Sequence, residues 1–237
     1  MFKNRTPWSS ISDLMSALMM VFLFISVSYA YQVTKQSQTL IEQSEQLSDQ
    51  NEQISEIVAE WEDYRALIYT DLTSEFENDL RSWDAEVDED TLSVRFNNPS
   101  LLFAAGRADI SAEFDLILKD FWPRYISVMT SYQDVIREVR IEGHTSSEWG
   151  RASLDESYFR NMELSQSRTR AALQKCYFYT EPQHVEWVRG NVTANGMSFS
   201  NPVYNADGTE NSLLSRRVEF TVVIDSYKKL KEISEEL

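Results

Sequence analysis

The spacing of apolar residues changes twice along the chain and divides it into three parts. Residues 11–32 are almost continuously apolar, broken by small hydroxyl side chains and by one formal charge, Asp13. A helix of about 20 residues is long enough to cross a hydrocarbon core of ~30 Å. Trp8 precedes this run and Tyr31 closes it, as aromatic side chains do at membrane interfaces. The pattern predicts a transmembrane helix over 11–32, preceded by a short N-terminal segment, residues 1–10.

Residues 33–68 keep one apolar position in every seven, and residues 33–90 contain neither glycine nor proline. Glutamine, serine and glutamate fill most positions between, and the second apolar position of a coiled-coil heptad is weak. The pattern predicts a long helical connector, which is either a solvated spacer or a marginal parallel dimer seam. A dimer seam would bring two copies of Asp13 close together. The repeating apolar residues are Val33, Leu40, Leu47, Ile54, Trp61 and Ile68.

From residue 91 onwards, strand-like alternation and helix-like periodicity follow each other. "TLSVRF" places Leu92, Val94 and Phe96 on one face of a half-buried strand, and Ser111 is the expected N-cap of the first helix. The order strand-helix-strand-helix-strand-strand predicts an α+β domain over 91–227, with helices packed on one face of a mixed sheet, and then a tail at 228–237. The expected strands cover 91–96, 135–145, 191–197 and 215–225, and the expected helices cover 111–131 and 163–179.

The formal net charge of −16 argues against nucleic-acid binding, because no face concentrates lysine and arginine. Residues 36–90 hold 17 acidic residues against two arginines, so most of the charge belongs to the connector. Lys3 and Arg5 precede the apolar run, and the chain beyond it is acidic. The positive-inside rule therefore places the N-terminus in the cytoplasm and the folded domain outside the inner membrane, in a bacterial periplasm.

A cleaved signal peptide is the alternative interpretation of the N-terminus, with "SYA" at 28–30 as a loose cleavage site. The apolar run is longer than that of a signal peptide, and Asp13 falls at its entrance. We therefore expect a retained, single-pass membrane helix. Cys176 is the only cysteine, which excludes an internal disulfide.

Asp13 is the strongest candidate for chemistry. A carboxylate in lipid costs several kcal/mol unless it is neutralised, paired or hydrated, and such residues commonly mark ion paths. It could load and release H⁺ or hold Na⁺, and no other cofactor is expected. The alternative is a carboxylate that only caps the helix near the interface. A shared helix face with four small or flexible side chains suits a seam between helices and implies partner chains. These side chains are Ser9, Ser12, Ser16 and Met20.

The stretch "PWSSISDLMSALMMVFLFISV" resembles the transmembrane start of MotB-type stator subunits. The resemblance implies that Asp13 carries the ion, that two copies form a homodimer, and that a larger multi-span ring subunit of the MotA type surrounds them. Leu14 after Asp13, the "LMMVFLFI" run and the long connector resemble in particular the ZorB-type subunits of Zorya anti-phage defence systems. This narrower resemblance implies a ZorA-type ring subunit as partner.

Residues 91–225 resemble the OmpA-like peptidoglycan-binding domain, in stretches that include "IEGHTSSEWG", "NMELSQSRTRAAL" and "NSLLSRRVEF". In that family, an aspartate after "GHT" and an arginine in "LSxxR" grip the charged ends of diaminopimelate. Arg168 occupies the arginine position, whereas Ser146 stands at the aspartate position, and Glu148 is an acid that could replace it. The alternative is that Arg168 and Arg217 are structural. The resemblance implies as peptidoglycan-binding residues Thr145, Ser146, Glu148, Asn161, Leu164, Arg168 and Arg217.

These patterns and resemblances together predict a non-enzymatic ion-channel or stator subunit of a wall-anchored, ion-driven rotary motor that serves anti-phage defence. The alternatives are a flagellar-type stator subunit, a passive membrane-to-peptidoglycan tether and, if the N-terminus is cleaved, a secreted wall binder. No Cys/His pair has metal-ligand spacing, and His144 is expected to order a loop by hydrogen bonding.

Overall fold

The computed structural model describes residues 7–104 and 106–225, without the side chains of residues 7–10, 99 and 100. The predicted tail at 228–237 and the first six residues lie outside this description. The chain divides into two compact units, the first ending at Ile57 and the second beginning at Val58.

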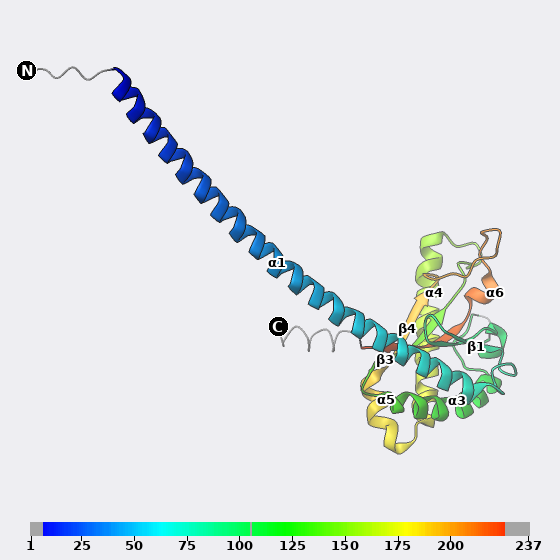
Figure 1. The fold of residues 1–237 in the computed structure, drawn as a ribbon. Coiled ribbons are helices and arrows are strands. Elements are labelled where there is room, and N and C mark those ends of the chain that lie inside the picture. Colours follow the sequence, from blue (N-terminus) through cyan, green and yellow to red (C-terminus); the bar gives the residue numbers. More distant parts are fainter. Residues whose placement is uncertain (1–6, 105, 226–237) are drawn as a thin grey trace, which may run out of the picture. The chain divides into compact units, whose positions relative to one another are not determined.

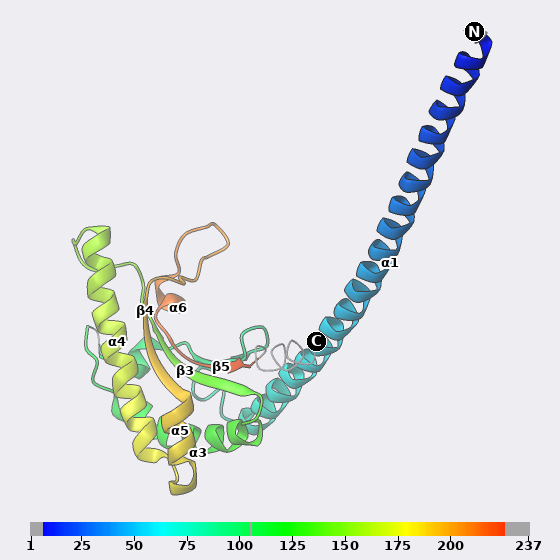
Figure 2. The ribbon, with the colours of Figure 1, turned by 90° about the vertical axis from the view of Figure 1, so that its left-hand side faces the viewer.

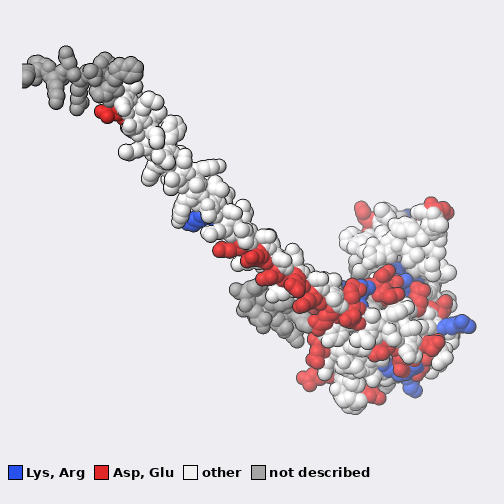
Figure 3. All heavy atoms as spheres, viewed as in Figure 1, with Lys and Arg blue, Asp and Glu red and all other residues white. Residues whose placement is uncertain are grey.

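The first unit is the leading part of helix α1 (Pro7–Phe76). Its apolar portion reaches a mean hydropathy of 2.0 and is long enough to cross a membrane, and its side chains are exposed. Figure 3 shows mainly uncharged atoms over this portion and acidic side chains along the later part of the helix. The predicted continuous helix from the apolar run into the connector is therefore confirmed.

The second unit is an α+β domain around a five-stranded sheet with the order β1-β2-β5-β3-β4 (Figure 1). The strands β3 and β4 pair in parallel, and the other neighbours pair antiparallel. Helix α4 packs on β3 and β4 and also against α3, as Figure 2 shows from the side. The strands are β1 (Ala85–Asp88), β2 (Ser93–Phe96), β3 (Ile136–His144), β4 (Val192–Ser198) and β5 (Val218–Ile224). The helices are α2 (Pro99–Leu102), α3 (Ala112–Ser131), α4 (Leu154–Tyr179), η1 (Pro182–His184), α5 (Val185–Asn191) and α6 (Ser212–Ser215).

The predicted α+β class and mixed sheet are confirmed, because β2, α3, β3, α4, β4 and β5 follow the expected order. Ser111 accepts a hydrogen bond from the backbone N–H of Phe114 at 2.9 Å and so caps α3 as expected. Strand β1, the short helices α2, α5 and α6 and the turn η1 were not predicted. Each is too short to show a clear period in the sequence.

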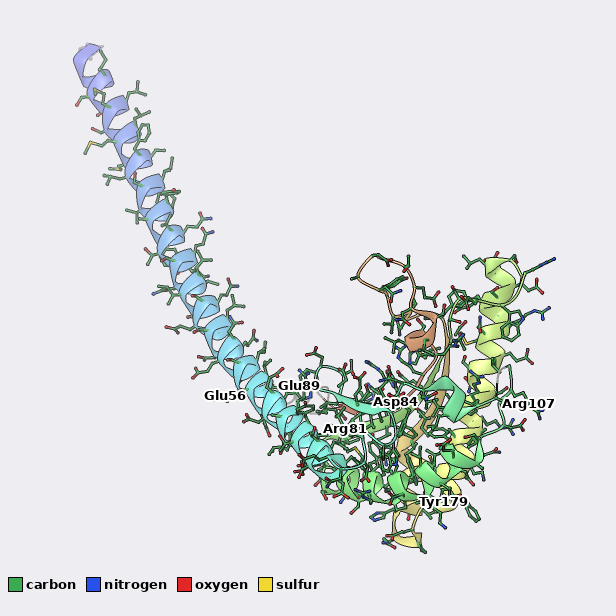
Figure 4. All side chains as sticks on the ribbon, turned by 90° about the vertical axis from the view of Figure 1, so that its right-hand side faces the viewer. Glu56, Arg81, Asp84, Glu89, Arg107 and Tyr179 are labelled. Atoms are coloured by element: carbon green, nitrogen blue, oxygen red, sulfur yellow. The ribbon has the colours of Figure 1, made fainter. Side chains whose placement is uncertain are left out.

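The core between the sheet and the helices is rich in aromatic rings. Phe121 of α3 lies 5.3 Å from Phe96 and 5.0 Å from Phe220, measured between ring centroids. Tyr179 lies at the end of α4 (Figure 4). Its hydroxyl donates a hydrogen bond to Asp115 of α3 at 2.9 Å, which ties the two helices together. The core therefore fixes α4, the helix that carries three of the seven predicted binding residues.

The last part of α1 belongs to this core, which corrects the predicted boundary at residue 91. Ile68, Leu72 and Phe76 are fully buried, and Trp61 packs against the same cluster. The folded unit starts near Val58 because the last two apolar positions of the seven-residue repeat face the domain. The four earlier positions remain exposed, namely Val33, Leu40, Leu47 and Ile54.

Polar contacts reinforce this helix end. Arg124 of α3 donates to Glu75 at 2.6 Å and to Asp79 at 2.9 Å. Arg65 donates to the backbone oxygens of Glu89 and Asp90 at 3.1 and 2.8 Å. The predicted connector at 33–90 thus contains both an exposed helix and a structural part of the folded domain.

Candidate ligand groove and membrane-helix carboxylate

Two glycines let α4 approach the sheet closely. A Cβ atom at Gly143 of β3 would lie 2.7 Å from the Thr169 side chain, and one at Gly196 of β4 would lie 2.4 Å from the backbone nitrogen of Gln166. The buried side chains of α4 at this contact are also small, namely Ser165 and Thr169, which face Gly143 and Gly196 of the sheet. This close packing fixes the position and orientation of α4 on β3 and β4, and therefore relative to the loops at the end of these strands.

The loop after β3 is held from two sides. The backbone N–H of Thr145 donates to the Ser198 oxygen at 2.8 Å. The backbone N–H of Ser147 donates to Glu210 at 3.0 Å, and the Ser147 hydroxyl donates to the same carboxylate. Thr145 and Ser146 are buried as a result, each 3% exposed.

A groove of about 690 Å³ lies between this loop, α4 and the segment around Phe103. It brings together six of the seven residues that the sequence assigned to peptidoglycan binding. Sequence reasoning missed five other lining side chains, Phe103, Ala104, Trp149, Leu213 and Arg216. The six predicted residues in the lining are Thr145, Ser146, Glu148, Asn161, Leu164 and Arg168.

Arg168 is held in place by the backbone and by an aromatic ring. Its Nε donates to the Arg107 oxygen at 2.9 Å, and its Nη2 donates to the Ala104 oxygen at 3.4 Å. Figure 4 shows Arg107 on the loop beside α4. The guanidinium lies 4.9 Å from the centre of the Phe103 ring, within cation–π range. Burial, and secondarily the charge of Arg216, lower the pKa of Arg168 to about 10.

Two buried donors in the same groove lining as Arg168 lack partners among the described residues. The Thr145 hydroxyl and the Asn161 amide nitrogen have no hydrogen-bond partner among the described residues. An unsatisfied buried polar group costs about 1–3 kcal/mol, so such groups call for a ligand or ordered water. Together with Arg168 they form a set of donors that suits a carboxylate.

Glu148 lies at the rim of the groove, with a side chain that is 68% exposed. It accepts a hydrogen bond from the Ser212 hydroxyl at 3.1 Å and lies 3.9 Å from Arg216. The other predicted residue at this position, Ser146, offers a hydroxyl that cannot form an ion pair. Glu148 is therefore the acid in the lining that could meet a positive group.

Arg217, the seventh predicted residue, is not in the lining of this groove. Its side chain is buried and donates to Glu219 at 2.5 Å and to the Asn201 oxygen at 3.2 Å. These contacts favour the structural role that was the alternative for Arg217. The neighbouring Arg216 reaches the groove instead, because side chains of consecutive residues in extended backbone point to opposite faces.

Glu142, His144 and Glu219 form a cluster that sequence spacing did not reveal. One ligand atom of each lies within 4.8 Å of the others, so the three could in principle surround a metal ion. However, Arg95 and Arg217 both donate to Glu219, and this positive charge disfavours a divalent cation. Contrary to expectation, the His144 ring has no hydrogen-bond partner among the described residues, and its Nε2 lies 3.7 Å from Glu142.

Asp13 lies on the exposed surface of α1, in the apolar portion of the helix. Ser16, one turn further, donates its hydroxyl to the Ser12 oxygen at 2.9 Å, so this hydroxyl is satisfied within the helix. Ser12, Ser16 and Met20 are exposed like Asp13, as are all residues from 11 to 50. The Ser9 side chain of the same predicted face lies outside the described residues.

A curated relative matches almost the whole chain. The Zorya protein ZorB of Escherichia coli is 43% identical over 236 residues, which cover 99% of this chain and 94% of the relative. The chain belongs to the ZorB family. The predicted ZorB-type resemblance is therefore confirmed. No family model matches this ZorB-family chain.

Several solved structures resemble the ZorB-family chain in part. A MotB-like protein from Desulfovibrio vulgaris is 20% identical, covers 69% of this chain and 93% of its own, and has a TM-score of 0.49. The cell wall anchor of the T6SS from Pseudomonas aeruginosa is 24% identical, with coverages of 65% and 97% and a TM-score of 0.46. The periplasmic domain of Helicobacter pylori MotB is 17% identical, with coverages of 60% and 82% and a TM-score of 0.42.

Proposed function

We propose that this ZorB-family chain is the ion-carrying, wall-anchored stator subunit of an ion-driven motor in anti-phage defence. It is not itself an enzyme. Asp13 binds and releases H⁺ or Na⁺, and α1 crosses the inner membrane once with its N-terminus in the cytoplasm. The observation that carries the proposal is a single carboxylate, Asp13, on the exposed surface of an apolar helix long enough to span a membrane.

A carboxylate at this place requires partner chains. Its cost in lipid falls when it is protonated, paired with a cation, or placed in a hydrated seam between helices. One helix cannot enclose such a path. Two copies of the chain inside a multi-span ring subunit of the ZorA type would enclose it. Loading and unloading a cation then changes the charge at Asp13, and the ring steps relative to the central pair.

A motor of this kind also needs a fixed point. The groove supplies one if it holds the peptide stem of peptidoglycan. Arg168, the Asn161 amide and the Thr145 hydroxyl would bind a carboxylate of the stem, and Glu148 is placed to meet an ammonium group. The support for this assignment is the pair of buried donors that share the groove lining with Arg168 and lack partners among the described residues.

The experiment is an Asp13→Asn substitution in the complete defence system, with phage plating efficiency as the measure. We expect protection to be lost while the amount of protein and its assembly with the ring subunit stay unchanged. Asp13→Glu keeps the carboxylate and should retain some protection. Asp49→Asn is the matched control, because Asp49 is an exposed acid of the connector outside the apolar portion. Cation flux through the purified complex in liposomes should follow the same order.

A passive tether is the second candidate, favoured by the burial of Ile68, Leu72 and Phe76 at the end of α1. This burial joins the helix firmly to the folded domain, as a tether also requires. A tether needs no carboxylate in its membrane span. Full protection with Asp13→Asn would therefore support the tether and contradict the ion-driven motor.

A further inference from the structure

Two guanidinium groups share the lining of the groove. Arg168 comes from the middle of α4, and Arg216 comes from the segment between α6 and β5. Like charges at close quarters repel each other, and the burial of Arg168 weakens the screening by solvent on its side. Consistent with this, burial and the charge of Arg216 lower the pKa of Arg168. The fold therefore maintains an excess of positive charge that an anion would relieve.

The acids near the groove do not balance this charge. Glu148 is the acid of the lining, but its side chain is 68% exposed and its distance to Arg216 is 3.9 Å. Glu210 is occupied by the N–H and the hydroxyl of Ser147. The lining thus carries two positive charges and one solvent-exposed negative charge.

The neutral donors point to the same kind of ligand. The Thr145 hydroxyl and the Asn161 amide are buried, lack partners among the described residues, and line the groove with the two arginines. Arg168 uses Nε and Nη2 for backbone oxygens, and its Nη1 takes part in neither bond. All these groups can donate hydrogen bonds to a carboxylate, whereas the uncharged Ser146 cannot form an ion pair with an ammonium group.

We propose that Arg216 and Arg168 together form a carboxylate receptor, so that the groove selects a wall peptide by its carboxylate and tolerates the loss of its amino group. This inference rests on the proposed wall-binding function of the groove. An exposed acid such as Glu148 contributes little to binding an ammonium, because solvent screens the pair. A carboxylate between two guanidinium groups forms charge-assisted hydrogen bonds, which are the stronger kind.

The test measures binding by the full-length chain in nanodiscs to three soluble probes. The first is the peptidoglycan stem tripeptide that ends in diaminopimelate. The second has the carboxylates of that residue amidated, and the third has its side-chain amine acetylated. We expect amidation to weaken binding about tenfold or more, and acetylation to weaken it at most about fivefold.

Arg216→Gln should weaken binding of the first probe about tenfold. It should leave binding of the amidated probe, which is already weak, nearly unchanged. Arg216→Lys keeps the charge and should restore part of the affinity. Arg137→Gln is the matched control, because Arg137 is an exposed arginine of β3 outside the groove lining. Equal melting temperatures of the variants will show that the fold is intact.

Two results would overturn the inference in different ways. If the wild-type chain binds the tripeptide but acetylation abolishes binding and Arg216→Gln does not change it, the carboxylate receptor is wrong and wall binding stands. If the wild-type chain binds neither the tripeptide nor purified peptidoglycan sacculi, the proposed wall anchoring fails, and the inference fails with it.

Discussion

Arg217 and Glu219, two positions apart at the start of β5, form a buried ion pair with 2.5 Å between Nε and Oε1. Arg95 of β2 donates to the same carboxylate oxygen at 2.7 Å. The two guanidinium groups neutralise a glutamate that is 5% exposed and link β2 to β5 on the sheet face that carries these polar side chains. Arg217 therefore stabilises the sheet that supports the groove.

Arg217→Gln should destabilise the folded domain without a specific loss of ligand affinity. Removing one partner of a buried ion pair costs about 3–5 kcal/mol, and we expect the lower end because Arg95 remains. Urea unfolding of the full chain, followed by tryptophan fluorescence, measures the change. Arg137→Gln should leave the free energy of unfolding unchanged. An unaltered unfolding midpoint for Arg217→Gln would contradict the structural role.

The same pair predicts a loss of stability in acid. Burial alone would raise the pKa of Glu219, but the charge and hydrogen bond of Arg217, followed by the charges of His144 and Arg95, hold it below the ordinary value of 4.5. A carboxyl group with a lowered folded pKa stabilises the fold above its unfolded pKa, and this contribution disappears as the pH falls through the folded value. We expect the melting temperature to fall below about pH 4.5, and more steeply in the wild type than in Glu219→Gln. If the melting temperatures of the wild type and of Glu219→Gln fall equally steeply with pH, Glu219 does not cause the loss of stability in acid.

Leu72→Ala tests where the folded domain begins. Leu72 is fully buried, so truncation to alanine should lower the free energy of unfolding by about 2–5 kcal/mol. Leu47→Ala removes the same atoms from an exposed position of the same helix and should change the stability of the domain by less than ~0.5 kcal/mol. If the two variants unfold alike, α1 does not contribute to the core.

Arg168→Gln should separate wall binding from stability. The substitution removes a charge of the groove together with two hydrogen bonds to backbone oxygens. The folded domain should lose no more than ~1 kcal/mol, because the relief of burial and of repulsion from Arg216 offsets part of this loss. Co-sedimentation of the full chain with purified sacculi should fall about tenfold or more. Undiminished sedimentation would show that the groove is not the wall-binding site.

The exposed apolar positions of α1 predict a parallel homodimer. Leu40 is 58% exposed and belongs to the seven-residue repeat, so Leu40→Cys should form an intermolecular disulfide under mild oxidation. Glu42→Cys lies on the opposite face of the helix and should cross-link much less. The native Cys176 is fully buried and should not interfere. Equal cross-linking of both variants in membranes would contradict a defined seam.

Local sequence patterns were sufficient for much of the architecture. An apolar run of membrane-spanning length predicted the start of α1, and alternation in "TLSVRF" predicted β2. Ser111 marked the beginning of α3 because N-cap chemistry is local. The motifs around Thr145 and Arg168 also identified residues that meet in one groove.

The sequence by itself determined which main segments are helices or strands and which residues share a face. The reason is that side chains repeat every 3.6 residues in a helix and every 2 residues in a strand, so these patterns can be seen among nearby residues. Only the tertiary structure decided which surface each periodic face meets. A seven-residue repeat cannot distinguish a dimer seam from packing within a domain, and Ile68 turned out to be core. Likewise, two adjacent arginines in "SRRVEF" look equivalent until the fold buries Arg217 with Glu219 and the distant Arg95 and leaves Arg216 in the groove. These choices depend on contacts between residues far apart in the chain, which no local pattern encodes.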